Sequence, residues 1–313
     1  MIGFPSVSVI VPCFNSARTL EETLDSIFTQ TFPPFEVIVV NDGSTDQSTA
    51  LLQRYTASSP ERCIRVLEQK NRGVSAARNA GVNIAQGDLV CFLDADDLWH
   101  VDKLKLQVQA LIDFAPDYQA VAVVGVRRFT VEQLTGKKSF FRDTWVDANL
   151  TMGRRERIKT ILALANNEMA SCSTVLCPRS VFLEVGGWDE NLAMAEDWDL
   201  LIRLCEVLPL VSVPQPLLFY RKHSVSTTAC YSDYKRLEQQ QFSMLSEYSE
   251  RSGLDRKTRH HLVARHLQDF LGLCSGGRGD RLTLLGLLAR QIIYAPSNLG
   301  NRQFYRYLKR CIT

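Results

Sequence analysis

Short apolar segments alternate with amphipathic segments through the first third of the chain. Four runs rich in β-branched residues are typical of buried strands, and they cover about Val7–Pro12, Phe35–Val40, Ile64–Leu67 and Leu89–Leu93. Between them, apolar side chains recur at helical spacing over about Ala17–Gln30, Asp46–Tyr55 and Val74–Ala85. This alternation predicts an α/β fold with a mainly parallel sheet flanked by helices, in which ligands bind at the carboxyl ends of the strands.

The pattern is looser later in the chain. Ala120–Val126 is typical of a further strand, whereas Ile158–Ala165 and Trp198–Val207 are typical of helices. Near the C-terminus the apolar spacing is helical again. We therefore expect a ligand-binding α/β domain over residues 1–230 and a helical C-terminal extension over residues 231–313.

Charge is unevenly distributed, although the net charge is only +2. Residues 235–313 hold 14 basic and 6 acidic side chains, so this segment is positive and the rest of the chain is negative. A basic helical segment can contact an anionic membrane surface or an acidic partner, or it can simply be solvated. Peripheral membrane contact is our hypothesis for this segment. The alternative is that it packs within the protein or is kept soluble by its charge. No nucleic-acid partner is predicted, and the oligomeric state stays open.

The nine cysteines indicate a reducing compartment. Their number is odd, they form no C-x-x-C pair, and many lie within apolar runs, as buried free thiols do. The sequence does not open with a signal-peptide pattern, and no apolar run reaches the roughly 18 residues of a membrane span. We expect a cytoplasmic protein whose membrane contact, where it occurs, is peripheral and on the inner face.

Carboxylates gather where the fourth predicted strand ends. Asp94, Asp96 and Asp97 lie within four residues of one another. Mg²⁺ and Mn²⁺ prefer such oxygen ligands and can in turn hold a diphosphate. The alternative is that Asp97 caps a helix beginning near Trp99 while its neighbours are solvated. Capping accounts for one carboxylate, but like charges this close repel one another without a cation.

Three other segments carry candidates for nucleotide binding. At the end of the first strand, Pro12 and Phe14 offer backbone groups and a ring face to a base. Asp42 ends the second strand and could accept a hydrogen bond from a base N–H, while Arg78 could reach a phosphate. Each has a structural alternative, namely an ordinary turn for the first two segments and an exposed helix arginine for the third.

Two motifs in the second half of the chain could contribute to catalysis. Glu196 and Asp197 enter an amphipathic helix, where they either complement its dipole or place a general base beside an acceptor hydroxyl. An aromatic ring nearby, that of Trp188, could stack on a sugar. His223 follows an apolar run and is either structural or a ligand of a metal or phosphate.

Seven segments follow one another in a characteristic order. They are VSVIVPCFN, VVNDGSTD, NRGVSAARN, FLDADD, GGWDENL, EDWDL and YRKHSVS. Together they resemble the family 2 glycosyltransferases, which have the GT-A fold, over residues 6–227. The resemblance implies a metal-dependent, inverting enzyme that moves a sugar from a nucleotide-sugar, most often a UDP-sugar, to an acceptor hydroxyl. The implied acceptor is a glycan or a lipid-linked sugar in the synthesis of a polysaccharide or other glycan.

The resemblance also implies roles for individual residues. The implied nucleotide site consists of Pro12, Phe14, Asn15, Asp42, Arg78, Asp94 and Ala95. The implied ligands of a Mn²⁺ or Mg²⁺ ion are Asp96, Asp94 and His223. Asp197, with Glu196 beside it, would be the general base, and the implied acceptor residues are Trp188 and Asp189. Phe14 stands where the family often has tyrosine, which leaves the stacking surface intact.

Other classes of protein fit the motifs less well. A sugar nucleotidyltransferase would require a glycine-rich loop after the first strand, and Pro12–Ala17 contains no glycine. A P-loop enzyme would require G-x-x-x-x-G-K-[ST], which is absent. A catalytically inactive nucleotide-binding or assembly subunit of the same fold would have no evident need for Asp94, Asp96 and Asp197 together. The donor sugar and the acceptor are not defined by these patterns.

Overall fold

The computed structural model describes most of the N-terminal two thirds of the chain and a short part of the remainder. The described residues are 4–58, 60–131, 138–144, 153–154, 156–158, 161, 171–192, 195–222, 243–244 and 246–255. The chain divides into two compact units, of which the first comprises Met1–Gly153, Asn167–Asn191 and Glu196–His223. The helical extension expected over 231–313 lies almost wholly outside the described residues, so that prediction stays open. Everything below concerns the first unit.

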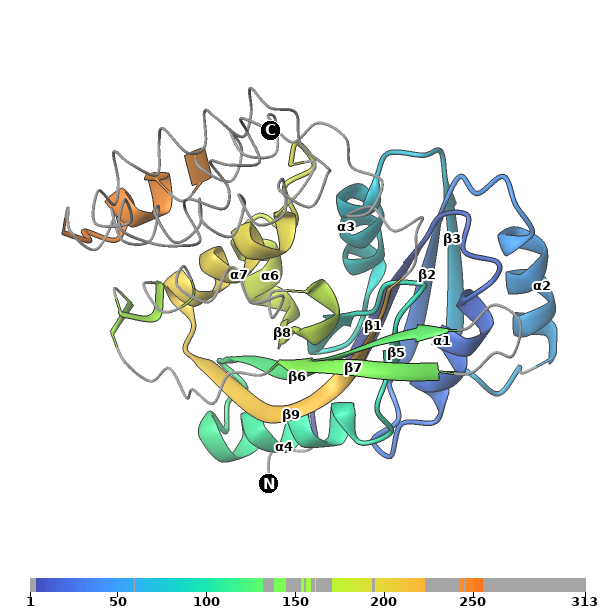
Figure 1. The fold of residues 1–313 in the computed structure, drawn as a ribbon, viewed down its shortest axis with the longest axis horizontal. Coiled ribbons are helices and arrows are strands. Elements are labelled where there is room, and N and C mark those ends of the chain that lie inside the picture. The colour runs from blue at the N-terminus through green and yellow to red at the C-terminus, as the bar shows by residue number, and fades with distance from the viewer. Residues whose placement is uncertain are drawn as a thin grey trace, which may run out of the picture. The chain divides into compact units, whose positions relative to one another are not determined.

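The first half of this unit alternates strands and helices as the sequence predicts (Figure 1). The elements are β1 (Val7–Cys13), α1 (Leu20–Phe28), β2 (Glu36–Asp42), α2 (Ser48–Ser58), β3 (Ile64–Gln69), α3 (Val74–Ile84) and β4 (Leu89–Phe92). The later elements are β5 (Leu98–Trp99), α4 (Lys103–Phe114), β6 (Val121–Val131), β7 (Lys138–Thr144), η1 (Cys172–Thr174), β8 (Leu176–Pro178), α6 (Arg179–Glu184), α7 (Glu196–Val207) and β9 (Leu210–Arg221). The predicted strand at Ala120–Val126 and the predicted helix at Trp198–Val207 are confirmed, whereas most of Ile158–Ala165 lies outside the described residues.

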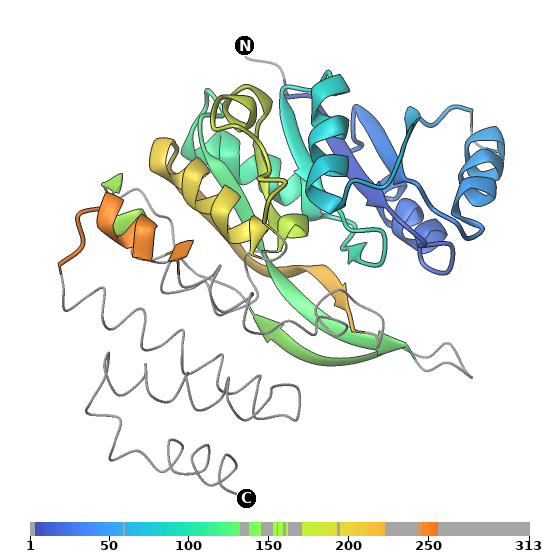
Figure 2. The same cartoon turned by 90° about the horizontal axis from the view of Figure 1, so that it is seen from above.

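The sheet is mixed, with strand order β3-β2-β1-β4-β8-β6-β9-β5 and β7 paired to β6. The strands β3, β2, β1 and β4 are parallel, as the alternation of strands and helices predicts. Beyond β4 the sheet departs from that pattern, because β8 is antiparallel to both β4 and β6. Figure 2 shows the antiparallel strands β6 and β7 running side by side.

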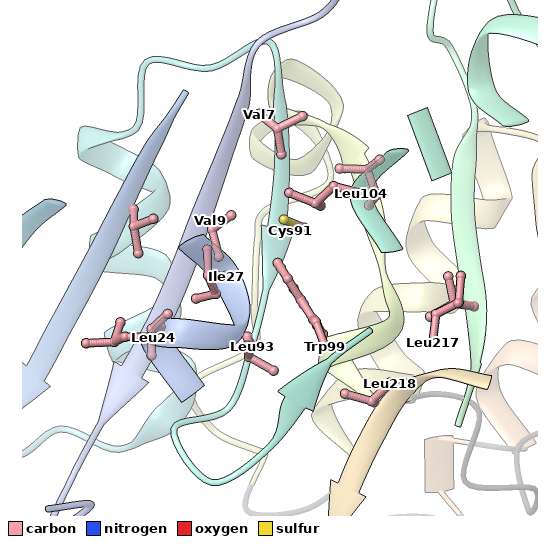
Figure 3. Packing of buried hydrophobic residues seen from close by; sticks show 14 of the residues in the cluster. Val7, Val9, Leu24, Ile27, Cys91, Leu93, Trp99, Leu104, Leu217 and Leu218 are labelled. Atoms are coloured by element: carbon pink, nitrogen blue, oxygen red, sulfur yellow. The ribbon is translucent and has the colours of Figure 1, made fainter. Parts of the chain in front are cut away.

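Helices cover both faces of the sheet. On one face, alternate residues of β1, which include Val7 and Val9, pack with Leu24 and Ile27 of α1 and with Leu104 of α4 (Figure 3). On the other face, α3 packs directly on β1 and β2. Because every second side chain of a strand points to the same face, the continuous apolar run of β1 supplies both layers of the core.

A glycine brings α3 close to the sheet. A Cβ atom on Gly81 would lie 2.5 Å from Cγ2 of Ile10, a separation that real side chains do not adopt. The expectation that the small residues of this helix permit close packing on the sheet is therefore confirmed. Since Arg78 lies on the same helix, this close packing brings its guanidinium to the ends of the strands.

The segment after β4 differs from one of our interpretations. Asp97 does not cap a helix beginning near Trp99, because α4 begins at Lys103 and β5 lies between them. The residue at the N-cap position of α4 is Asp102. The side chain of Asp97 is 0% exposed and faces the protein interior. The capping interpretation is wrong since a tertiary contact, not the next helix, holds this carboxyl.

Candidate active site

Arg78 connects carboxylates from two distant segments at the carboxyl ends of the strands. Its Nη2 donates to Oδ1 of Asp94 at 2.8 Å, and its Nη1 donates to Oε1 of Glu196 at 3.2 Å. The arginine side chain is buried, so the alternative of an exposed helix arginine is wrong. Predicted residues from α3, from the turn after β4 and from the start of α7 therefore meet in one cluster.

Asp94 is further fixed by the short helix η1, which the sequence patterns did not reveal. Its N–H donates to Oγ of Ser173 at 3.1 Å, and its Oδ2 lies 3.3 Å from Sγ of Cys172, which donates to it. Burial raises the pKa of the Cys172 thiol well above its ordinary value. The thiol is therefore protonated at neutral pH and can act as this donor.

The ring of Trp188 packs against the guanidinium of Arg78. The Cζ atom of Arg78 lies 4.6 Å from the centroid of the Trp188 ring, and Phe92 meets the same ring edge-on at 5.1 Å. The tryptophan side chain is only 2% exposed. The expectation that its ring is open for stacking on a sugar is therefore wrong in this structure. A cation–π contact of this buried kind stabilises the charged guanidinium instead.

The loop that carries Trp188 is joined to α3 by Asn79. The Trp188 N–H donates to Oδ1 of Asn79 at 2.8 Å, and Nδ2 of Asn79 donates to the Trp188 carbonyl at 2.9 Å. Gly187 has φ of +66°, and a Cβ there would lie 2.7 Å from Oδ1 of Asn79. Asp189 accepts hydrogen bonds from the backbone and side chain of Asn191, which closes the following turn.

Asp197 lies next to Glu196 at the start of α7. Its Oδ1 accepts the N–H of Trp198 at 2.9 Å. Burial raises the pKa of Asp197 well above its ordinary value, and Glu196 raises it further, while Arg78 opposes both. For Arg78 itself, burial disfavours the charged form, but the negative charges of Asp94 and Glu196 outweigh that effect and raise its pKa. The site thus pairs a permanent cation with a carboxylate of elevated basicity.

The two loops that follow β1 and β2 are fastened to each other. Oδ1 of Asn15 accepts the N–H of Thr45 at 2.8 Å, and the Asn15 N–H donates to Oγ of Ser44 at 3.0 Å. Asn15 therefore holds the loops together, in the left-handed conformation at φ of +51° that asparagine tolerates. Pro12 is buried in β1, whereas Phe14 is 48% exposed and its ring is accessible.

Asp42 organises the loop before α3. Its Oδ1 accepts from Nε2 of Gln69 at 2.7 Å and from the N–H of Arg72 at 2.8 Å. Its Oδ2 accepts the N–H of Gly73 at 2.9 Å. A carboxylate oxygen accepts two hydrogen bonds, so Oδ2 keeps capacity for one more donor, such as a base N–H.

The turn after β4 presents two candidate ligands for a divalent metal ion, Asp94 and Asp96. Within the part of the chain that the structure describes, no group of three or more His, Cys, Asp or Glu side chains is arranged to hold a metal. Mg²⁺ is usually held by one or two carboxylates together with phosphate oxygens and water, so Asp94 and Asp96 suit an ion that a diphosphate completes. The third predicted ligand, His223, lies outside the described residues.

A cavity of about 300 Å³ lies elsewhere, beside β5 and β9. Its lining includes Glu22, His100 and Phe129, and none of the predicted site residues lines it. We place the candidate site at the Arg78 cluster nevertheless, because that is where buried charge and hydrogen-bonded carboxylates converge. No helix within the described ranges combines the length and the hydropathy that crossing a bilayer requires.

The sequence matches a family model described as "Glycosyl transferase family 2" over residues 8–182, which is more than half of the chain. The chain belongs to glycosyl transferase family 2. The match begins in β1 and includes Asp42, Arg78 and Asp94. The resemblance drawn from the sequence motifs is therefore confirmed, and the protein is a glycosyltransferase.

Curated relatives of this glycosyltransferase act in several bacteria. The amylovoran biosynthesis glycosyltransferase AmsB of Erwinia amylovora is 31% identical over 220 residues, which are 69% of each chain. The putative teichuronic acid biosynthesis glycosyltransferase TuaG of Bacillus subtilis is 40% identical over 109 residues, 35% of this chain and 43% of the relative. Glycosyltransferase GlyA of Streptococcus pneumoniae is 40% identical over 117 residues, 37% of this chain. The chain spans only 16% of the length of GlyA.

Solved structures confirm the GT-A fold of this glycosyltransferase. S. aureus TarS 1–349 in complex with UDP-GlcNAc superposes with a TM-score of 0.59 at 23% identity, covering 92% of this chain and 79% of TarS 1–349. The mannosyltransferase PcManGT of Pyrobaculum calidifontis, in complex with GDP-Man and Mn²⁺, gives a TM-score of 0.58 at 20% identity, covering 98% and 86%. At these identities the likeness defines the fold.

Proposed function

We propose that this glycosyltransferase moves a sugar from a nucleotide-sugar to an acceptor hydroxyl by one displacement that inverts the anomeric configuration. The observation that carries the proposal is the convergence of Asp94, Glu196 and Asp197 on the buried guanidinium of Arg78. A leaving diphosphate needs positive charge beside it, and an attacking hydroxyl needs a base. The cluster offers both within one site.

The proposed donor is a UDP-sugar, and a GDP-sugar is the alternative to be tested. Two fold neighbours are complexes with UDP-GlcNAc and with GDP-Man, which supports a nucleotide-sugar without choosing the base. The exposed ring of Phe14 and the remaining acceptor capacity of Asp42 suit a base whose N–H points into the loop. Pro12, Asn15 and Ala95 would then shape the pocket through the backbone.

A divalent ion, Mn²⁺ or Mg²⁺, is the proposed cofactor. Asp96 and Asp94 would hold it together with the donor diphosphate, and His223 is carried as a third candidate. When bound, such an ion supplies positive charge that stabilises the departing diphosphate. The PcManGT complex contains Mn²⁺, which supports this choice of ion.

Asp197 is the proposed general base. Its neighbour Glu196 is engaged by Arg78, whereas Asp197 is half-buried and keeps a carboxylate oxygen for an acceptor hydroxyl. The raised pKa of Asp197 increases its affinity for the acceptor proton. Asp197 would take that proton as the acceptor oxygen forms its bond to the anomeric carbon and the bond to the diphosphate breaks.

The proposed acceptor is a glycan or a lipid-linked sugar in polysaccharide synthesis. The names of AmsB and TuaG connect those relatives with amylovoran and teichuronic acid, which supports this class of product. Asp189 and the loop of Trp188 remain the proposed acceptor residues, with Trp188 acting through Arg78 rather than by stacking. A cytoplasmic location with peripheral membrane contact through the basic C-terminal segment would suit a lipid-linked acceptor.

The experiment that tests the base compares Asp197→Asn with Asp199→Asn, a control on the same helix whose carboxylate binds Arg203. Each variant is incubated with a panel of UDP-sugars and GDP-sugars, and nucleotide release is measured beside calorimetric nucleotide binding. Asp197→Asn should bind nucleotide as tightly as the wild type does. It should set nucleotide free from the nucleotide-sugar about a hundredfold more slowly than the wild type. Wild-type release by Asp197→Asn would remove Asp197 from the base role. If the wild-type protein binds nucleotide but sets none free from any nucleotide-sugar, the result would favour the alternative of a catalytically inactive nucleotide-binding subunit.

A further inference from the structure

The turn that carries Asp96 is held by its main chain. Oγ1 of Thr19 donates to the Ala95 carbonyl at 2.7 Å, and Oγ1 of Thr23 donates to the same oxygen at 3.1 Å. Thr23 also donates to the carbonyl of Asp97 at 2.9 Å. Thr19 is the N-cap residue of α1 and Thr23 lies in its first turns, so this helix fixes the carbonyls of both neighbours of Asp96.

The carbonyl of Asp96 itself is held by Arg221, the last residue of β9. Nε of Arg221 donates to that oxygen at 2.7 Å. The backbone N–H of Arg221 donates to Oδ1 of Asp97 at 2.9 Å. One residue, 125 positions farther along the chain, thus contacts both the main chain of Asp96 and the side chain of Asp97.

Arg221 is itself locked in place. Its Nη2 donates to Oε2 of Glu22 at 2.6 Å, and its Cζ atom lies 4.9 Å from the centroid of the Phe129 ring. Burial opposes ionisation of Glu22, but hydrogen bonds from Lys138 and Arg221 outweigh that effect and lower the pKa of Glu22. Glu22 therefore stays charged, and Arg221, which is only 8% exposed, has a fixed partner on α1.

The chemistry of this contact explains why an arginine is needed. A guanidinium presents several N–H donors in a rigid plane, so Arg221 can bind Glu22 and the Asp96 carbonyl at the same time. Its positive charge also lies beside a turn with three acidic side chains, where it favours their charged forms. A lysine would keep the charge, but its single ammonium group cannot reproduce both directed contacts.

We propose that Arg221 is a positioning residue for the Asp96 carboxylate, held for this task by Glu22. By fixing the Asp96 peptide, Arg221 sets the direction in which the carboxylate projects toward the metal and the donor diphosphate. The inference rests on the proposed function, in which Asp96 is a metal ligand. Since α1 follows the loop of Phe14, one helix would hold the metal-binding turn in register with the base-binding loop.

The test measures how UDP and GDP binding depends on Mn²⁺ in four variants. Arg221→Lys and Glu22→Gln change the proposed contact, and Asp96→Ala removes the ligand itself. Arg65→Lys is the control, because Arg65 also joins a carboxylate and a carbonyl, those of Glu36 and Ile84, but near the amino-terminal end of β3. Calorimetric titrations are made with and without Mn²⁺, and thermal unfolding checks that each variant is folded.

Arg221→Lys should lose about tenfold in the Mn²⁺-dependent part of nucleotide affinity, because residues that orient a metal ligand typically have effects of this size. Its metal-free nucleotide affinity should stay at the wild-type value. Glu22→Gln should show a smaller loss in the same direction, and Arg65→Lys should show none. A general loss of structure would instead lower the affinity with and without metal alike.

Three results would overturn the inference, and they can be told apart. If Asp96→Ala abolishes Mn²⁺-dependent binding while Arg221→Lys behaves like the wild type, Arg221 does not position Asp96 and the proposed function survives. If the wild type shows no Mn²⁺ dependence with either nucleotide, the proposed metal role fails and this inference fails with it. Should Arg221→Lys not fold, wild-type Mn²⁺ dependence in Glu22→Gln would overturn the inference.

Discussion

The hydrogen bond of 2.8 Å between Arg78 and Asp94 joins the helix after β3 to the turn after β4. Arg78 is buried, and removing a charged group from water is costly unless it is paired and hydrogen-bonded. Asp94, Glu196 and the Trp188 ring together meet that requirement. The same contacts that keep the cation stable therefore assemble the candidate active site.

Arg78→Met should lower the free energy of unfolding by about 3 kcal/mol, because it leaves partly buried carboxylates without their cation. The control is Arg72→Met, since Arg72 is 61% exposed and pairs with Glu190 at the surface. Such an exposed pair contributes at most about 1 kcal/mol. Urea unfolding of both variants measures the difference. Equal stability of the two variants would contradict the structural role assigned to Arg78.

The pH dependence of transfer should reveal the influence of Glu196 on Asp197. Burial, followed by the charge of Glu196, raises the pKa of Asp197, so the base gains its proton at a higher pH than an ordinary aspartate. Activity should therefore fall on acidification through this raised pKa. Glu196→Gln removes one negative charge and should move the acidic limb of the kcat/KM profile to lower pH. An acidic limb at the wild-type position in Glu196→Gln would refute this coupling.

Lys103 should make the stability of the fold depend on alkaline pH. It is 0% exposed, and burial lowers its pKa to about 8, although Nζ donates to Gln107 and lies 3.8 Å from the Trp99 ring centroid. Because the folded pKa is below the unfolded one, the folded state must carry a buried charge below about pH 8. Stability from this group should rise between about pH 8 and 10.5, by about 3 kcal/mol in total.

Lys103→Met should remove this dependence, because methionine has a similar length and carries no proton. The measurement is the difference in the free energy of unfolding between wild type and variant, followed from pH 7 upward by urea titration. The contributions of the other titrating groups are the same in both proteins and cancel in that difference. A difference that stays constant with pH would show that Lys103 is not protonated differently in the two states.

The sequence predicts the elements whose signals are local. The runs that became β1 and β2 are continuously apolar and β-branched, and the helices between them have clear periodicity, so both were found. The strand β9 was not predicted as a strand because Pro214 and Pro216 interrupt it. The strand β8 has only three residues, too few to show a period.

In the candidate site, too, the sequence predicts only the residues that have a local signal. Asp94, Arg78 and Asp197 were identified because they lie in recognisable motifs. The burial of Asp97 depends on Arg221, 124 residues away, and no local pattern announces such a contact. The motif predicts that the Trp188 ring stacks on a sugar, yet Phe92 and Arg78 enclose this ring. Cys172 and Ser173 were missed since a thiol and a hydroxyl in a short helix carry no motif of their own.

The central claim is that this glycosyltransferase binds a nucleotide diphosphate with a metal ion held by Asp96. Calorimetric titration of the wild type and of Asp96→Ala with UDP and with GDP, each with and without Mn²⁺, tests it most directly. The account predicts tight UDP binding that requires Mn²⁺ and that Asp96→Ala abolishes. Tight GDP binding with the same dependence would change the donor base alone, whereas no binding of either nucleotide, or binding that Asp96→Ala leaves unchanged, would contradict the account.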